Sequence, residues 1–307
     1  MASQSLMQTK IASLSLQSPL LTASGTCGYS QEFGRLFDLN HLGAIVVKGI
    51  TLAPRRGNLG TRLVESPAGL INSIGLENPG VEDFISGEMP FLRQQKIPVI
   101  VNISGNTLEE YGALAARLNE VAGVSALEVN ISCPNVKQGG MAFGANCESA
   151  AAATRVVREH STLPLIVKLS PNVTDIAAIA KSVEAEGADA VSLINTLLGM
   201  AIDVDKQRPV LGNIMGGLSG PAIKPVALRM VWQVFKAVKI PIVGMGGISS
   251  WQDAAEFILA GAAAVAIGTA SFVNPIIIPE IHRGLKLYAE KQGVRNIAEL
   301  RGLAHQS

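Results

Sequence analysis

The sequence predicts an α/β protein built on a (β/α)8 barrel of the TIM type, with extra hairpins or insertions at the carboxyl face of the barrel. Eight short apolar runs rich in valine and isoleucine alternate with longer amphipathic stretches along 307 residues, a pattern typical of parallel strands joined by helices. No G-x-G-x-x-G fingerprint follows the first run, which counts against a dinucleotide-binding sheet. No linker, charge block or low-complexity tract divides the chain, so we expect residues 1–307 to form a single domain.

The predicted strands are short and consistently apolar. They cover residues 20–24, 44–48, 98–102, 127–130, 165–168, 191–195, 241–244 and 264–267. Three of the stretches between them are clear helices: residues 107–121 begin with Thr107 and have Glu110 three residues on, whereas residues 174–186 and 250–260 each end at a glycine. The two longest gaps, 49–96 and 196–240, leave room for hairpins above the barrel.

Composition excludes several classes of function. With 48% hydrophobic and 16% charged residues, the chain can bury a large core without disulfide or metal support. A formal net charge of +1 and 4% aromatic residues give no basis for a nucleic-acid partner. The three cysteines show neither metal-ligand spacing nor a disulfide framework, so we expect no metal site and a reducing, cytoplasmic location. The N-terminus does not resemble a signal peptide, and no apolar run is long enough to cross a membrane.

Polar residues recur where the predicted strands end. Two lysines and three asparagines hold this position, accompanied by small or hydroxyl residues: Ser24, Lys48, Gly49, Asn102, Asn130, Lys168, Asn195 and Thr196. One such residue alone could simply cap the next helix, but lysine and asparagine are poor strand residues and are costly to bury without partners. Because the carboxyl ends of barrel strands converge on one face, we expect a site there for a planar, anionic, amide-containing ligand.

Glycines follow the last two predicted strands, at Gly246, Gly247 and Gly268, the last beside Thr269. Backbone N–H groups in such turns can approach a phosphate closely, and barrels commonly bind phosphate between these two loops. Glycines can also serve only to form tight turns, but their presence in both loops favours a phosphorylated cofactor or substrate. The loop 216–221, which contains Gly220, is a weaker candidate for the same phosphate.

Cys133 lies just after the fourth predicted strand, between Ser132 and Pro134. A lone cysteine is usually an inert small hydrophobe, but this one falls at the polar mouth of the barrel, and nearby glycines would let its loop act as a lid. None of the four histidines falls at a strand end, so a cysteine–histidine or serine–histidine pair is not supported. Proton abstraction by Cys133 is the interpretation that remains, whereas Cys27 and Cys147 are interpreted as structural or incidental.

Four motifs together resemble the class 1 dihydroorotate dehydrogenases: NSIGLENPG at 72–80, NISCPNVKQGG at 130–140, VKLSPN at 167–172 and GMGGI at 244–248. The likeness runs from about residue 20 to 275 and includes all eight predicted strand ends. Two further segments, KGITLAPRRGN at 48–58 and NTLLGMAID at 195–203, make it most similar to the catalytic subunit of class 1B.

The resemblance implies roles that spacing alone does not establish. FMN would be contacted by Ser24, Lys48, Gly49, Asn102, Asn130, Lys168 and the backbone of Ile194, and its phosphate by Gly220, Gly246, Gly247, Gly268 and Thr269. The substrate would be contacted by Lys48, Asn72, Ser73, Ile74, Gly75, Leu76, Asn130, Asn135, Asn195 and Thr196. Cys133 would take the C5 proton of dihydroorotate while a hydride leaves C6 for the flavin, the oxidation to orotate that serves pyrimidine synthesis.

The same resemblance implies a partner. The resemblance to class 1B implies a two-subunit enzyme, in which a second subunit carries FAD and a 2Fe–2S cluster and passes electrons to NAD+. Two copies of each subunit would form a heterotetramer. This sequence has neither cluster ligands nor a dinucleotide fingerprint, so its electrons must be exported.

Other readings stay open at this point. They are a class 1A homodimer that uses fumarate, another FMN barrel such as the pyrimidine-reducing domain of dihydropyrimidine dehydrogenase or a tRNA dihydrouridine synthase, and a non-catalytic flavin- or phosphate-binding subunit. The near-neutral charge argues against the tRNA enzyme. A membrane-bound class 2 enzyme is not expected, because no amphipathic N-terminal extension is seen.

Overall fold

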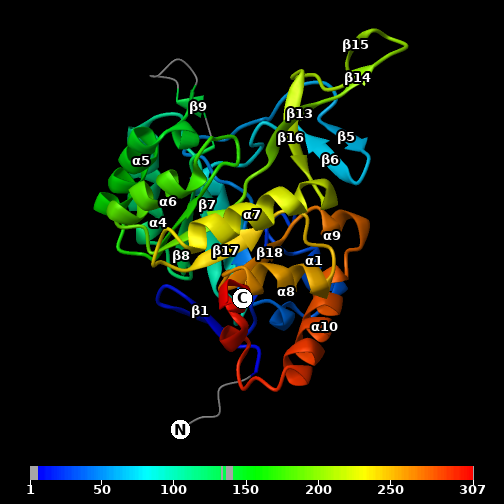
Figure 1. Cartoon of the computed structure of the whole chain (residues 1–307). Coiled ribbons are helices and arrows are strands. Elements are labelled where there is room, and N and C mark those ends of the chain that lie inside the picture. The colour runs from blue at the N-terminus through cyan, green and yellow to red at the C-terminus, as the bar shows by residue number, and fades with distance from the viewer. Residues whose placement is uncertain (1–5, 133, 136–140, 307) are drawn as a thin grey trace.

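The computed structural model describes residues 6–132, 134–135 and 141–306 (Figure 1). Its centre is a parallel sheet of eight strands in the order β3-β18-β17-β12-β11-β8-β7-β4. An isolated parallel bridge between Leu21 and Ala44 joins the first strand of this order to the last, so the sheet closes into a barrel. The predicted (β/α)8 barrel is therefore confirmed.

The barrel strands fall on the predicted runs: two coincide at both ends, and the ends of the others differ by at most two residues. Their bounds are β3 (Leu20–Thr22), β4 (Ile45–Val46), β7 (Val99–Ile103), β8 (Ala126–Asn130), β11 (Leu165–Lys168), β12 (Ala190–Leu193), β17 (Ile242–Met245) and β18 (Ala264–Ile267).

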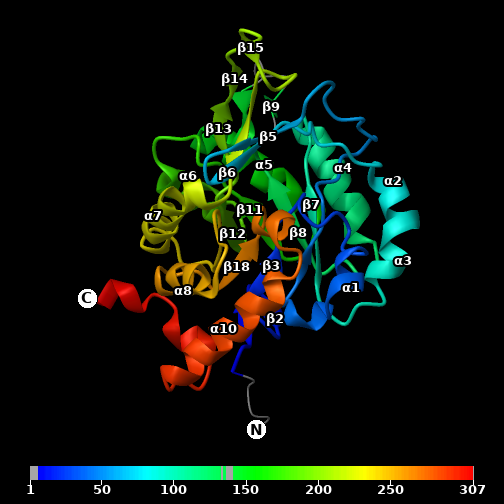
Figure 2. The same cartoon turned by 90° about the vertical axis from the view of Figure 1, so that its right-hand side faces the viewer.

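Helices surround the barrel in both views (Figures 1 and 2). The longer ones are α4 (Leu108–Asn119), α5 (Cys147–His160), α6 (Ile176–Ala185), α7 (Lys224–Phe235), α8 (Trp251–Leu259) and α10 (Ile277–Lys291). Shorter helical segments are α1 (Phe33–Leu36), η1 (Leu39–His41), α2 (Val81–Asp83), η2 (Phe84–Glu88), α3 (Met89–Leu92), η4 (Phe143–Ala145), η5 (Pro221–Ile223), α9 (Ala270–Val273), η6 (Ile297–Leu300) and η7 (Leu303–Gln306).

The three helices expected from the sequence form, and their starts are fixed by side-chain caps. Thr107 and Ser250 cap α4 and α8, and each side chain accepts a hydrogen bond from the backbone N–H three residues on, at Glu110 and Asp253. The start expected at residue 174 is one residue early, because Asp175 is the cap and accepts from two N–H groups of α6. Gly187 and Gly261, just past α6 and α8, have φ of +89° and +121°, a backbone conformation that favours glycine.

The two long gaps build one structure together. The first supplies β5 (Leu63–Ser66) and β6 (Gly69–Asn72), and the second supplies β13 (Leu197–Met200) and β16 (Met215–Ser219). These strands pair in the antiparallel order β13-β16-β6-β5, and a further hairpin of β14 (Ile202–Asp203) and β15 (Arg208–Pro209) extends beyond them. Figure 1 shows this sheet above the barrel, at the end opposite the N-terminus. Hairpins above the barrel were expected; their pairing across the two gaps was not.

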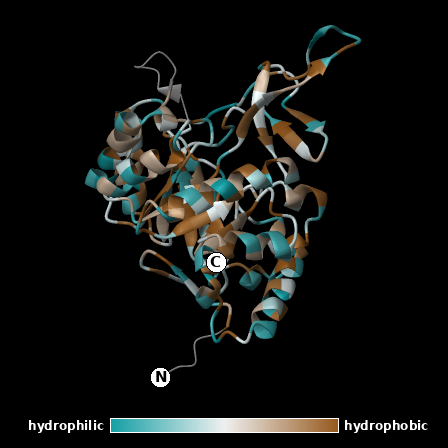
Figure 3. Cartoon of the chain, in the orientation of Figure 1, coloured by the Kyte–Doolittle hydropathy of each residue, from teal (hydrophilic) through white to brown (hydrophobic). Residues whose placement is uncertain are grey.

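The inside of the barrel is apolar at its amino end. Its buried cluster includes Leu21, Val46, Ile100 and Ile166, and the strands stand out as the hydrophobic part of Figure 3. A hairpin of β1 (Thr9–Ile11) and β2 (Leu14–Leu16), which the sequence did not reveal, closes this end with buried residues of both strands. A second and larger cluster fills the layer between strands and helices. At the carboxyl end, β9 (Pro134–Asn135) and β10 (Met141–Ala142) follow β8. No helix among the described residues is long and apolar enough to span a membrane.

Candidate active site

A cavity of about 990 Å³ lies between the carboxyl ends of the barrel strands and the sheet above them. It is lined by every predicted site residue except Cys133 and Asn135: Ser24, Lys48, Gly49, Asn72, Ser73, Ile74, Gly75, Leu76, Asn102, Asn130, Lys168, Ile194, Asn195, Thr196, Gly220, Gly246, Gly247, Gly268 and Thr269. Cys133 and the side chain of Asn135 lie outside the described residues. None of the four histidines lines the cavity.

Strand periodicity explains why polar side chains reach the inside of the barrel. Successive strand residues face opposite sides, so residues two apart share a face. Ile100 and Ile166 belong to the apolar interior, and Asn102 and Lys168 follow each of them by two positions. The floor of the cavity is therefore the first polar layer above an apolar one.

Lys168 brings a buried positive charge to this floor. Its residue is 5% exposed, and its Nζ donates a hydrogen bond to Ser24 Oγ at 3.0 Å. No carboxylate of the described chain forms an ion pair with it. A buried ammonium with a single hydroxyl partner is costly, so this arrangement fits a ligand that carries negative charge or strong acceptors.

Amide side chains connect two strand ends across the cavity. Asn195 Nδ2 donates to Asn130 Oδ1 at 3.2 Å and to Ser132 Oγ at 2.9 Å. Asn130 Oδ1 also accepts from the backbone N–H of Ser132 at 3.1 Å, and its carbonyl accepts from the Tyr111 hydroxyl at 2.6 Å. This network fixes the chain up to the residue that precedes Cys133.

The glycine loops form a cradle that side chains would fill. Gly247 has φ of +77°, and a Cβ added there would lie 2.9 Å from the Gly220 carbonyl oxygen and 2.9 Å from the Lys224 nitrogen. Beside them, Thr269 Oγ1 donates to Ser219 Oγ at 2.7 Å. Backbone N–H groups and hydroxyls at such close approach suit a phosphate. Lys224 is already paired with Asp253 at 2.7 Å and Glu256 at 3.0 Å.

The loop after β6 covers the cavity from the other side. Asn58 Nδ2 holds it by donating to the Ser73 carbonyl at 3.1 Å and to Ser73 Oγ at 3.0 Å. Arg62 donates a hydrogen bond to Glu77 at 2.5 Å and lowers the pKa of that carboxyl below its ordinary value. Leu76 has φ of +56°, a conformation rare for a non-glycine residue and often found at binding sites.

Comparison with known proteins decides the family. The family model described as "Dihydroorotate dehydrogenase" matches residues 6–288. The chain belongs to the dihydroorotate dehydrogenase family.

The relatives of this dihydroorotate dehydrogenase family member also agree on its class. The chain is 62% identical over 299 residues to a protein of Desulforamulus reducens, covering 97% of this chain and 98% of that protein. It is 56% identical over 297 residues to a protein of Desulforudis audaxviator, covering 97% of each. It is 53% identical over 296 residues to a protein of Geobacter sp., covering 96% and 97%. All three are named "Dihydroorotate dehydrogenase B (NAD(+)), catalytic subunit", so the resemblance to class 1B is confirmed.

Sequence reasoning missed several residues of this site. Asn172 donates to the Thr196 carbonyl at 3.1 Å and accepts from the Leu198 N–H at 2.9 Å, which fixes the start of β13. The motif 167–172 contained it, but the residue lies beyond the strand end and was not singled out. Ser219 lines the cavity through a pairing of β16 that the sequence did not predict.

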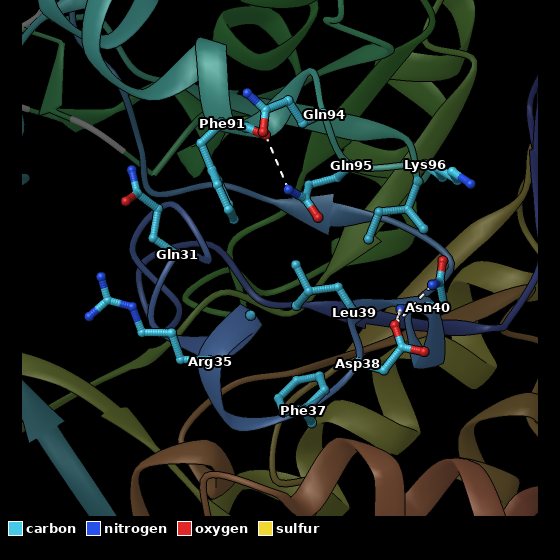
Figure 4. A pocket seen from close by; sticks show the side chains of 12 residues that line it. Gln31, Arg35, Phe37, Asp38, Leu39, Asn40, Phe91, Gln94, Gln95 and Lys96 are labelled. Carbon is cyan, nitrogen blue, oxygen red and sulfur yellow. Dashed lines mark hydrogen bonds between the residues drawn. The ribbon is translucent and has the colours of Figure 1, made fainter.

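A second cavity, of about 600 Å³, lies away from the strand ends, between the η1 and α3 segments (Figure 4). Charged and amide side chains line it, among them Arg35, Asp38, Gln94 and Lys96. It shares no residue with the predicted site. The described residues contain no cluster of three or more histidine, cysteine or acidic side chains suited to a metal ion.

Proposed function

We propose that this chain is the FMN-binding catalytic subunit of an NAD+-linked dihydroorotate dehydrogenase, which oxidises (S)-dihydroorotate to orotate in pyrimidine synthesis. The observation that carries the proposal is the convergence of polar strand ends, scattered from Ser24 to Thr269, on one cavity of about 990 Å³. We assign cofactor and substrate together to that cavity, because the chain belongs to the dihydroorotate dehydrogenase family and barrel enzymes bind their ligands at the carboxyl face.

The cavity fits FMN at both ends of the cofactor. The glycine cradle leaves backbone room for a phosphate, and the buried ammonium of Lys168 has no counter-ion among the described residues. We assign the ring system to Ser24, Lys48, Gly49, Asn102, Asn130, Lys168 and the backbone of Ile194, and the phosphate to Gly220, Gly246, Gly247, Gly268 and Thr269. When bound, FMN would supply the acceptor for the hydride that leaves C6 of dihydroorotate.

Dihydroorotate is a carboxylate with ring amide groups, and the opposite wall of the cavity offers matching chemistry. Lys48 supplies a cation, and Asn72, Asn130, Asn195 and Thr196 supply amide and hydroxyl groups. We include Ser73, Ile74, Gly75, Leu76 and Asn135 in the substrate site on the strength of the family resemblance.

Cys133 is proposed as the base that takes the C5 proton. It comes directly after Ser132 in the sequence. Ser132 lines the cavity, and its Oγ accepts a hydrogen bond from Asn195. A free thiol has a pKa of about 8.5 and is partly ionised near neutral pH, which suits a base that must work without a histidine. Lys168 would stabilise the negative charge on the flavin ring once the ring is reduced.

We also propose where the electrons go. The curated relatives are named as NAD(+) enzymes and as catalytic subunits, which supports a partner that carries the electrons onward. Following the resemblance, that partner holds FAD and a 2Fe–2S cluster in a heterotetramer of two plus two, and the assembly works in the cytoplasm. We treat residues 1–307 as one FMN-binding domain without affinity for nucleic acid or membrane.

The test is anaerobic. Purified protein should carry one FMN, and dihydroorotate should bleach its visible flavin absorbance within a single turnover. Re-oxidation by NAD+ should require the partner subunit. Fast re-oxidation by fumarate without a partner would favour a class 1A enzyme, and a protein that takes up no FMN would overturn the proposal.

A further inference from the structure

A buried carboxylate lies beneath the cavity floor, and the proposed function gives it no task. Glu128 is on β8, where it pairs in register with Asn102 of β7, and it is 2% exposed. It follows Ala126 of the apolar interior cluster by two positions, so its side chain also points into the barrel. Asn102 lines the cavity and Glu128 does not, so the carboxylate reaches the site only through its neighbours.

Glu128 holds one of those neighbours in a single orientation. Its Oε2 accepts a hydrogen bond from Asn102 Nδ2 at 2.6 Å, and its Oε1 accepts from Ser192 Oγ at 2.7 Å. A carboxylate can only accept, so the nitrogen of the Asn102 amide must face it. The amide oxygen then lies on the other side, where a Cβ added to Gly49 would be 2.8 Å from Asn102 Oδ1. No described residue donates a hydrogen bond to this oxygen.

We propose that Glu128 is a positioning residue, which keeps the Asn102 carbonyl oxygen turned toward the cavity as an acceptor for a ring N–H of the flavin. The inference rests on the proposed function, because it takes the flavin as the ligand above Asn102. The two ends of an asparagine amide are nearly equal in size, so shape alone does not choose between them. The short hydrogen bond to the buried carboxylate of Glu128 selects one orientation of the amide, because charge-assisted hydrogen bonds are stronger than neutral ones.

A purely structural role predicts something different. Glu128 and Ser192 are both buried, and their bond connects β8 to β12. A residue that only supports the barrel would change stability, and any loss of FMN affinity would not depend on Asn102. A residue that acts through Asn102 must lose its effect when Asn102 is removed.

The experiment is a mutant cycle on FMN binding. Apoprotein of the wild type, Glu128→Met, Glu128→Gln, Asn102→Ala and the Glu128→Met/Asn102→Ala double variant is titrated with FMN and followed by quenching of flavin fluorescence. Methionine fills a similar volume and offers only a weak sulfur acceptor, whereas the glutamine oxygen can still accept from Asn102. Glu184→Gln is the matched control, because Glu184 accepts from the backbone N–H groups of Lys239 and Ile240 before β17, at the other end of the barrel.

We expect Glu128→Met to weaken FMN binding by up to about tenfold, the upper range for one hydrogen bond between neutral groups, because Asn102 can then turn its amide nitrogen toward the flavin N–H. Glu128→Gln should fall between the wild type and Glu128→Met, because its amide oxygen can accept from Asn102 but its amide can also donate and no longer forces that orientation. The double variant should bind no more weakly than Asn102→Ala. Equal losses from Glu128→Met with and without Asn102 would overturn the inference, as would a glutamine variant as weak as the methionine variant.

The controls separate this inference from the proposed function. If wild-type apoprotein binds FMN and the cycle shows no coupling, only the role of Glu128 fails. If the wild type binds no FMN, the proposed function fails first and the inference fails with it. Should Glu128→Met not fold, the cycle is run with Glu128→Gln and with Glu128→Leu, and additivity in both would still refute the proposal.

Discussion

Replacing Lys168 with methionine should change the stability of the apoprotein and the affinity for FMN in opposite directions. Lys168 is 5% exposed, and within the described part of the chain its ammonium has one partner, Ser24 Oγ at 3.0 Å. In the apoprotein, this charge is largely removed from water and no described carboxylate pairs with it. Methionine fills similar space without the free-energy cost of burying an unpaired charge. We expect the free energy of unfolding of the apoprotein to rise by about 1 kcal/mol.

The affinity for FMN should fall in the same variant. A hydrogen bond to a charged group contributes about 1.5–3 kcal/mol, so Lys168→Met should weaken FMN binding by roughly 10- to 150-fold. Thermal unfolding of apoprotein and fluorescence titration with FMN measure the two effects separately. Lys236→Met is the control: Lys236 is exposed and its ammonium lies 5.2 Å from the ring centre of Trp232, so FMN affinity should stay unchanged and the free energy of unfolding should fall by no more than about 1 kcal/mol. A Lys168→Met protein that binds FMN like the wild type would refute the assignment of this lysine.

Three further perturbations test other parts of the site. Cys133→Ala should keep its yellow flavin and lose most of its reduction by dihydroorotate in stopped flow, whereas Cys133→Ser should be slower with a pH optimum shifted upward; unchanged rates would remove the thiol from the mechanism. Gly247→Ala should weaken FMN binding at least tenfold, because its Cβ would meet the Gly220 oxygen at 2.9 Å; Gly293→Ala has a similar φ of +69° with nothing within 4 Å and should bind FMN normally. Burial works against ionisation of Asp253, but hydrogen bonds from Lys224, Ser249 and Ser250 outweigh it and hold the pKa of this carboxyl below its ordinary value. Its stabilising contribution should be full above the unfolded pKa near 3.9 and fade as the pH falls below it, so Asp253→Asn should lower the melting temperature at pH 7 and flatten the acid limb of stability; an acid limb like that of the wild type would contradict this.

The sequence was sufficient to predict the barrel because every strand is a short apolar run, with a polar residue or a glycine at its carboxyl end or within the next two residues. Lys168 and Asn102 were visible for that reason: each breaks an apolar run at its last position. Helix starts were also predictable wherever one residue could cap, as at Ser250. At the start of α6, the adjacent residues Thr174 and Asp175 could each cap the helix. The structure uses Asp175, whose carboxylate accepts hydrogen bonds from two backbone N–H groups.

Other features depend on contacts between distant segments. The pairing of β6 with β16 joins residues about 145 positions apart, as the Asn72 bond to the Gly217 carbonyl shows, and no local pattern specifies it. The β1–β2 hairpin consists of strands of three residues, too short for a clear alternation. Glu128 did leave a signal, a carboxylate inside an apolar run, but only the fold reveals that Asn102 and Ser192 are its partners.

The most direct test of the central claim is a crystal structure of the protein with FMN and orotate. We expect the flavin ring above Asn102 and Lys168, its phosphate between the loops of Gly247 and Gly268, and the sulfur of Cys133 facing C5 of orotate. A flavin bound elsewhere, or a Cys133 sulfur turned away from the orotate ring, would contradict the account.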